Sequence, residues 1–288
     1  MNWMISLPAF LVGLALGSAS FGAEAPKEGR KLVWGDEFDG AGLDRTKWSF
    51  RQTMNSTDCD YVNDVRTVRV ENDCLHLLTL KAENPEKRCL LSQGVTTADG
   101  MSWRYGYIEM RARVPFRHGA WPSFWMQSTP RYRKVKYLAE VDIFESFSSA
   151  NSVAANIHKW DGGKHSALVN QENMRAFSYV FPDAAKLNDE FHIYGFEWNP
   201  QEMSFYVDGK RFCSMKIDEE NDFDQKVVPG MGGFHDFMFV IFNNEVFTPG
   251  HGWCPKGWEL NGEKDLPIEY FIDWIRLWQR DGESLRTM

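Results

Sequence analysis

The chain has 288 residues, of which 43% are hydrophobic, enough for one large domain with a sizeable core. Its formal net charge of -8 disfavours polyanionic partners such as nucleic acids and strongly sulfated glycans, because binding to them needs a basic surface. The 5 cysteines show no metal-ligand spacing, and their odd number leaves at least one without a partner in the chain. Which of the others form disulfides stays open.

Residues 1–25 predict a signal peptide. An apolar stretch from Ile5 to Leu16 is followed by small residues up to Ala23. This stretch is too short to span a bilayer. We therefore expect cleavage somewhere from Ala19 to Ala25, a secreted or periplasmic protein, and no membrane span.

The rest of the chain has an all-β pattern, in which short runs of alternating apolar residues are separated by turn residues. In chain order the predicted strands are 31–34, 65–70, 75–82, 105–114, 123–127, 139–146, 153–158, 191–198, 203–207, 237–242 and 270–279. Asp208-Gly209 predicts the turn of a β-hairpin. So many strands, with apolar ones near both ends, predict a two-sheet sandwich in residues 26–280. A frayed tail is expected at 281–288.

The segment from Glu140 to Glu145 places three carboxylates in a strand that otherwise favours apolar residues. Side chains alternate in a regular strand, so Glu140 and Asp142 share one face, roughly 7 Å apart, and Glu145 points the other way. A β-bulge at residues 143–144 would return Glu145 to the face of the other two and leave Val141 and the bulged pair for the core. Three acids on one face predict a glycosidase-like site.

This acidic segment resembles the signature of glycoside hydrolase family 16 in its bulge-containing form, which laminarinases, agarases and related endo-galactanases share. Other segments are similar to that family in order and spacing: 32–40, 105–113, 119–126, 191–198, 205–209 and 272–277. The resemblance covers residues 31–280 and implies a β-jelly-roll sandwich of the concanavalin A-like type, whose concave sheet forms a glycan-binding cleft.

The resemblance implies that Glu140 is the nucleophile, Glu145 the general acid/base, and Asp142 the residue between them that tunes Glu140. The chemistry agrees, because a retaining glycosidase needs two carboxyls about 5 to 5.5 Å apart, one to attack the anomeric carbon and one to protonate the departing oxygen. Repulsion from the ionised nucleophile keeps its neighbour protonated until the glycosyl ester forms. A calcium site or a solvated edge strand fits less well, because these acids alternate with Val and Ile.

Tryptophans near the acids are candidate sugar platforms, since sugars have apolar faces and indole offers a flat surface with a polar edge. Trp121 and Trp125 lie on the strand that precedes the acids, with Trp103 and Trp160 nearby in sequence, and some of these four should form platforms. Trp121 and Trp125 are the two that we expect in the cleft. Three later tryptophans are expected in the sandwich core: Trp198, Trp274 and Trp278.

Four polar residues complete the predicted substrate-binding set. His158, on the strand after the acids, is expected to bond a sugar hydroxyl or Asp142. Asn243 and Glu245 share a face of a later strand that should line the cleft. Arg104 is included as a ligand for a hydroxyl further along the glycan, although an ordinary surface arginine fits the sequence better.

The sequence therefore predicts a secreted, endo-acting, retaining glycoside hydrolase, expected to be a monomer. It would cleave internal β-linkages of a glucose- or galactose-containing glycan, either a β-1,3-glucan or a galactan or galactose-rich host glycan. A lectin-like module without turnover is the alternative from another class, although a binder has no reason to retain both catalytic acids. A transglycosylase would use the same residues. No cofactor is expected for catalysis, and the resemblance implies a structural calcium ion near Asp273, away from the chemistry.

Overall fold

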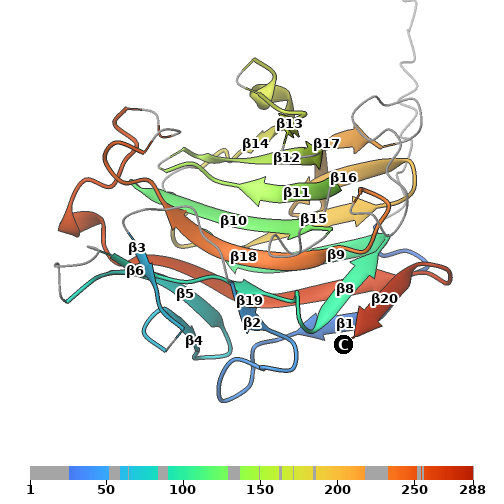
Figure 1. Ribbon diagram of the computed structural model, residues 1–288, viewed down its shortest axis with the longest axis horizontal. Coiled ribbons are helices and arrows are strands. Elements are labelled where there is room, and N and C mark those ends of the chain that lie inside the picture. The colour runs from blue at the N-terminus through green and yellow to red at the C-terminus, as the bar shows by residue number, and fades with distance from the viewer. Residues whose placement is uncertain are drawn as a thin grey trace, which may run out of the picture.

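The computed structural model describes residues 26–51, 59–63, 65–83, 90–128, 137–148, 150–161, 164–170, 172–183, 186–217, 233–251, 254 and 256–287. Within these residues the chain forms a 10-stranded sheet, an 8-stranded sheet and a separate pair of strands. The two large sheets lie in separate layers (Figure 1). This architecture confirms the predicted all-β jelly-roll sandwich. The predicted signal peptide lies outside the described residues and stays a prediction.

The 8-stranded sheet carries the acidic segment near its centre. Its strand order is β13-β12-β11-β10-β18-β7-β2, and β14 pairs with β12. The strands are β2 (Ser49–Phe50), β7 (Val95–Thr96), β10 (Ala120–Gln127), β11 (Tyr137–Glu145), β12 (Ser152–Asp161), β13 (Lys164–Ala167), β14 (Ser178–Val180) and β18 (Phe239–Val246).

The 10-stranded sheet forms the other layer, in the order β17-β16-β15-β9-β19-β5-β6-β3, with β1 on β19 and β4 on β5. Its strands are β1 (Lys31–Asp36), β3 (Cys59–Tyr61), β4 (Val68–Val70), β5 (Leu75–Lys81), β6 (Leu90–Ser92), β9 (Gly106–Arg113), β15 (His192–Trp198), β16 (Glu202–Val207), β17 (Lys210–Lys216) and β19 (Ile268–Gln279). The helical segments among the described residues are η1 (Met174–Phe177) and η2 (Glu263–Asp265), and neither could cross a membrane.

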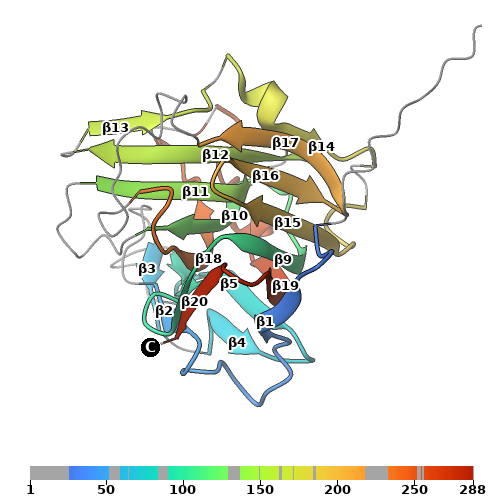
Figure 2. The same ribbon diagram turned by 90° about the vertical axis from the view of Figure 1, so that its right-hand side faces the viewer.

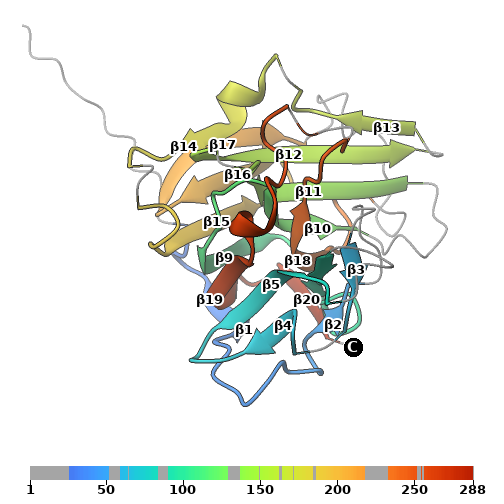
Figure 3. The same cartoon turned by 90° about the vertical axis from the view of Figure 1, so that its left-hand side faces the viewer.

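The core fills the space between the layers, with β10, β11 and β12 on one side and β9, β15 and β16 on the other (Figures 2 and 3). Trp198 is fully buried there, as predicted. Trp274 and Trp278 are only half-buried and lie outside the core cluster, so their predicted place was wrong. The reason is a register shift in β19, where Asp273 is an extra residue opposite β9, which reverses the faces of the residues after it.

The C-terminal residues are not a frayed tail. Ser284–Thr287 form β20, which pairs antiparallel with β8 (Met101–Arg104). Leu285 packs against the core cluster from this strand. The predicted hairpin at Asp208-Gly209 is confirmed, because it joins β16 to β17 and both residues have a positive φ, 50° and 74°.

Candidate active site

The acidic strand β11 contains the predicted bulge. Against β10, Asp142 faces Trp125 and Phe144 faces Phe124, so one residue of β11, Ile143, has no counterpart. The pairing with β12 shifts at the same place. Ile143 and Phe144 both enter the hydrophobic core, as does Val141. The three acids therefore share the opposite face of the sheet, as the sequence predicted.

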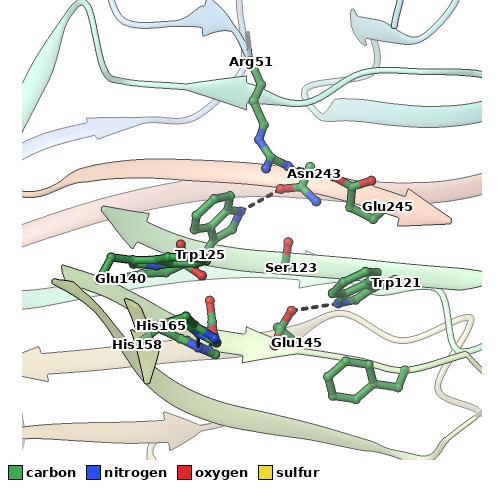
Figure 4. Close-up of a pocket in the computed structure, with 13 residues that line it drawn as sticks. Arg51, Trp121, Ser123, Trp125, Glu140, Glu145, His158, His165, Asn243 and Glu245 are labelled. Atoms are coloured by element: carbon green, nitrogen blue, oxygen red, sulfur yellow. Dashed lines mark hydrogen bonds and ion pairs between the residues drawn. The ribbon is translucent and has the colours of Figure 1, made fainter. Parts of the chain in front are cut away.

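That face bears a cavity of about 370 Å³ (Figure 4). Its walls come from β10, β11, β12, β13 and β18 and from the segments that follow β2 and β11. The cavity is lined by Arg51, Trp121, Ser123, Trp125, Glu140, Asp142, Glu145, Phe147, His158, Trp160, His165, Asn243 and Glu245. Eight of these residues were predicted site residues, and Arg104 is the predicted substrate-binding residue that the cavity lacks.

Each of the three acids accepts a hydrogen bond from a different kind of donor. The Gln127 amide donates to Glu140 at 2.7 Å, and the Trp121 indole N–H donates to Glu145 Oε1 at 2.8 Å. His158 Nε2 lies 2.7 Å from Asp142 Oδ2. The three carboxyls therefore face one cavity but occupy different electrostatic environments.

These environments determine where the protons reside. Burial, together with the negative charge of Asp142, raises the pKa of Glu145 from 4.5 to about 8. Burial alone would lower the pKa of His158, but the charge and the hydrogen bond of Asp142 raise it to about 9. At neutral pH Glu145 is therefore protonated, as a general acid must be. His158 is a cation at the same pH, and its charge balances the neighbouring Asp142.

An aromatic stack forms the wall on the β12 side. His165 Nε2 lies 2.8 Å from His158 Nδ1, and the His165 ring stacks on Trp160 with centroids 4.3 Å apart. Because the protonated His158 donates through both ring nitrogens, His165 accepts from it. Trp160 is one of the tryptophans that the sequence offered as platforms, and Trp103, also considered, is fully buried in the core. His165 was missed, and it becomes a neighbour of Trp160 through the pairing of β12 with β13. The only signal for His165 was its position shortly after Trp160 in the sequence.

The opposite wall combines an aromatic ring with a buried ion pair. Trp125 donates its indole N–H to Asn243 Oδ1 at 2.7 Å. Arg51 pairs with Glu245 at 3.1 Å, and its guanidinium lies 4.7 Å from the Trp125 ring centroid. Both charged side chains are almost completely buried. Arg51 was missed because no local pattern connects it with a partner 194 residues away.

Trp121 lies in the cavity as expected, with one face of its ring covered, whereas Arg104 lies elsewhere. One face of the Trp121 ring stacks on Phe247, with centroids 4.8 Å apart and planes 12° apart, so that face is not available to a sugar. Arg104 lies outside the cavity, with its guanidinium 5.6 Å and 5.2 Å from the rings of Tyr105 and Phe237. Packing on these rings accounts for Arg104 without a ligand.

The acidic side chains at the predicted calcium site form ion pairs in the structure. The Asp273 carboxylate pairs with Arg111, and the neighbouring Glu37 is held by both ends of the Arg276 guanidinium. The calcium site stays a prediction, and no step of the chemistry depends on it.

Comparison with known proteins identifies the family of this chain. A model of the GH16 domain of β-porphyranases A–D matches residues 33–280. The β-glucanase of Rhodothermus marinus is 27% identical over 96% of this chain and 95% of its own length. The glucan endo-1,3-β-glucosidase A1 of Niallia circulans is 25% identical over 87% of this chain, which spans only 38% of that relative. The keratan-sulfate endo-1,4-β-galactosidase of Sphingobacterium multivorum is 24% identical over 86% of this chain and 55% of its own length.

Solved structures agree on the fold. A structure from work on endo-acting O-glycanases of the human gut microbiota, which initiate mucin breakdown, aligns with a TM-score of 0.69. It is 23% identical, and the alignment covers 88% of this chain and 92% of that one. The matched domain extends over nearly all the described residues, and the bulged strand carries its three acids into one cavity. The chain therefore belongs to glycoside hydrolase family 16.

Proposed function

We propose that the protein is an exported, retaining endo-β-glycosidase that acts on a galactose-containing glycan. The observation that carries the retaining mechanism is the bulge in β11, which brings Glu140 and Glu145 onto one face with Asp142 between them. The β-porphyranase domain model and the endo-1,4-β-galactosidase relative favour galactose over glucose. The signal-peptide pattern of residues 1–25 supports export.

In the first step Glu140 attacks the anomeric carbon while Glu145 protonates the departing glycosidic oxygen. The result is a glycosyl ester on Glu140 and a free leaving group. In the second step Glu145, now ionised, takes a proton from water, whose oxygen attacks the same carbon and releases Glu140. Asp142 supports both steps, because its negative charge favours the protonated form of Glu145 and is itself balanced by His158.

The glycan would lie across the strands rather than along them. From β13 to β18 the cavity presents, in turn, the His165–Trp160 stack, the acids, the β10 tryptophans, and the polar pair of Asn243 and Glu245. Aromatic rings suit the apolar faces of sugars, and the polar groups suit their hydroxyls. This arrangement supports the binding of several consecutive sugar units, as an endo-acting enzyme requires.

Replacing Glu140 with Gly tests the nucleophile. Turnover should be lost, and added azide should restore product formation with inverted anomeric configuration, because the small anion attacks from the position of the missing carboxylate. Glu245→Gly is the matched control, since Glu245 is as buried in the same cavity but lies on β18. An azide product from the Glu245 variant and none from the Glu140 variant would refute the assignment.

Product analysis tests the substrate. The purified enzyme would be offered a β-1,3-glucan, agar, porphyran, keratan sulfate and mucin glycans, and released oligosaccharides would be identified by mass. We expect internal cleavage of one or more of the galactose-containing glycans. Cleavage of the glucan alone would overturn the galactose proposal and leave the glycosidase assignment intact.

A further inference from the structure

The side chain of Trp121 has a fixed position beside the general acid. Its indole N–H donates to Glu145 Oε1 at 2.8 Å. Its ring is stacked on Phe247, and the His251 ring stands edge-on to it with planes 82° apart. Trp121 is 7% exposed, so neighbouring rings determine its orientation and the N–H points at one chosen oxygen of the acid.

This contact restricts where Glu145 can carry its proton. An indole nitrogen is a donor only and never accepts a hydrogen bond. Oε1 therefore accepts from Trp121. Because a protonated carboxyl accepts best through its carbonyl oxygen, this contact favours the form of Glu145 that holds its hydrogen on Oε2. We propose that Trp121 is a positioning residue that directs the catalytic proton to Glu145 Oε2 and stabilises the carboxylate formed after the first step. The inference rests on the retaining mechanism proposed above.

The two half-reactions make different demands on this contact. In the first, the Oε2–H bond breaks as the proton passes to the glycosidic oxygen, which also receives the electrons of the breaking bond to the anomeric carbon. The indole N–H then faces a carboxylate, and a hydrogen bond to a charged acceptor is the stronger kind. In the second, Oε2 takes a proton from water as the water oxygen bonds to the anomeric carbon and Glu140 leaves as a carboxylate.

Trp121→Phe removes the N–H and keeps an aromatic ring on Phe247. Trp125→Phe is the matched control, because Trp125 lies on the same strand and face and donates to Asn243 instead of an acid. The other charged and titratable groups of the cavity are unchanged in both variants: Glu140, Asp142, His158, His165, Glu245 and Arg51. The readout is kcat/KM against pH on the natural glycan and on an aryl glycoside with a good leaving group.

For Trp121→Phe we expect the alkaline limb of kcat/KM on the glycan to move about one pH unit higher, since the lost donor favoured the ionised form. We also expect slower turnover of the aryl glycoside with an unchanged first step, because only the second step needs the carboxylate. Trp125→Phe should leave the limb in place. An unmoved limb in Trp121→Phe, or the same movement in both variants, would overturn the inference.

Two further proteins keep the test decisive. If Trp121→Phe does not fold, benzothienylalanine at position 121 preserves the shape of indole and removes only the N–H, and the same two outcomes apply. Glu145→Gln separates the inference from the mechanism on which it rests. A Glu145→Gln enzyme with normal activity on the glycan would refute the proposed mechanism, whereas an inactive one beside an unshifted Trp121→Phe would refute only the role of Trp121.

Discussion

At the scale of single residues, the three carboxyls of the site differ in the group that donates a hydrogen bond to each. Glu140 accepts from an amide, Glu145 from an indole and Asp142 from an imidazole whose pKa is raised to about 9. Of these three donors only the His158 imidazole is charged, and its positive charge balances that of Asp142, which lies between the other two acids. Glu145 is left with a proton at neutral pH because of its burial and of the remaining negative charge.

The protonation of Glu145 predicts the alkaline limit of activity. The general acid must hold its proton in the first step, so kcat/KM on the natural glycan should fall as the pH rises through about 8, the pKa of Glu145. An aryl glycoside with a good leaving group needs no protonation, so its first-step rate should lack this limb. An identical alkaline limb for both substrates would show that another group controls it.

The protons on Glu145 and His158 also affect the stability of the folded protein. Folded Glu145 keeps its proton up to about pH 8 and unfolded Glu145 loses it near 4.5, so the free energy of unfolding falls as the pH rises between these values. The contribution of His158 is fully present below its unfolded pKa of 6.5 and is lost as the pH rises through about 9. Glu145→Gln should therefore become increasingly stable relative to the wild type with rising pH, measured by urea unfolding. Parallel curves for the two proteins would contradict the shifted pKa of Glu145.

At the scale of elements, the features that local patterns encode could be predicted from the sequence. The bulge in β11 follows from the spacing of acids and apolar residues, and the turn at Asp208-Gly209 follows from its residue types. The faces of Trp274 and Trp278 could not be predicted, because the extra residue Asp273 is defined only by pairing with β9. The same limit applies to the cavity. Arg51 reaches it through a long-range ion pair with Glu245, and His165 through the pairing of β12 with β13, and neither contact can be predicted from local sequence spacing.

The turn between β16 and β17 tests whether its residue types alone determine its backbone conformation. Gly209 has φ +74°, and an added Cβ would meet nothing within 4 Å, so only the backbone conformation opposes a side chain. Gly209→Ala should lower the free energy of unfolding by about 1 kcal/mol. Gly209→Asn should cost less, because Asn tolerates the left-handed region. Urea unfolding of both variants measures the difference, and equal losses would mean that contacts, not φ, control the turn.

At the scale of the whole molecule, ion pairs of one buried arginine join the two ends of the described chain to the 10-stranded sheet. The Arg30 side chain is 1% exposed and pairs with Glu197 of β15 at 2.9 Å and with Glu283, just before β20, at 3.4 Å. Glu197 also accepts from the Tyr206 hydroxyl at 2.9 Å. A buried cation therefore connects the segment before β1, the middle of the sheet and the last strand.

Breaking this connection should destabilise the fold while leaving the chemistry intact. Arg30→Met leaves two carboxylates without their cation, which typically costs about 3 to 5 kcal/mol when the pair is fully buried. Because Glu197 and Glu283 are 23% and 14% exposed, we expect a smaller loss of about 2 to 4 kcal/mol in urea unfolding. Lys31→Met is the matched control, since Lys31 and Asp281 are fully solvated at 3.9 Å and should contribute nothing measurable. Folded Arg30→Met protein should keep its kcat, because the cavity lies on the other sheet; equal stability of the two variants would show that the buried cation does not hold the chain ends together.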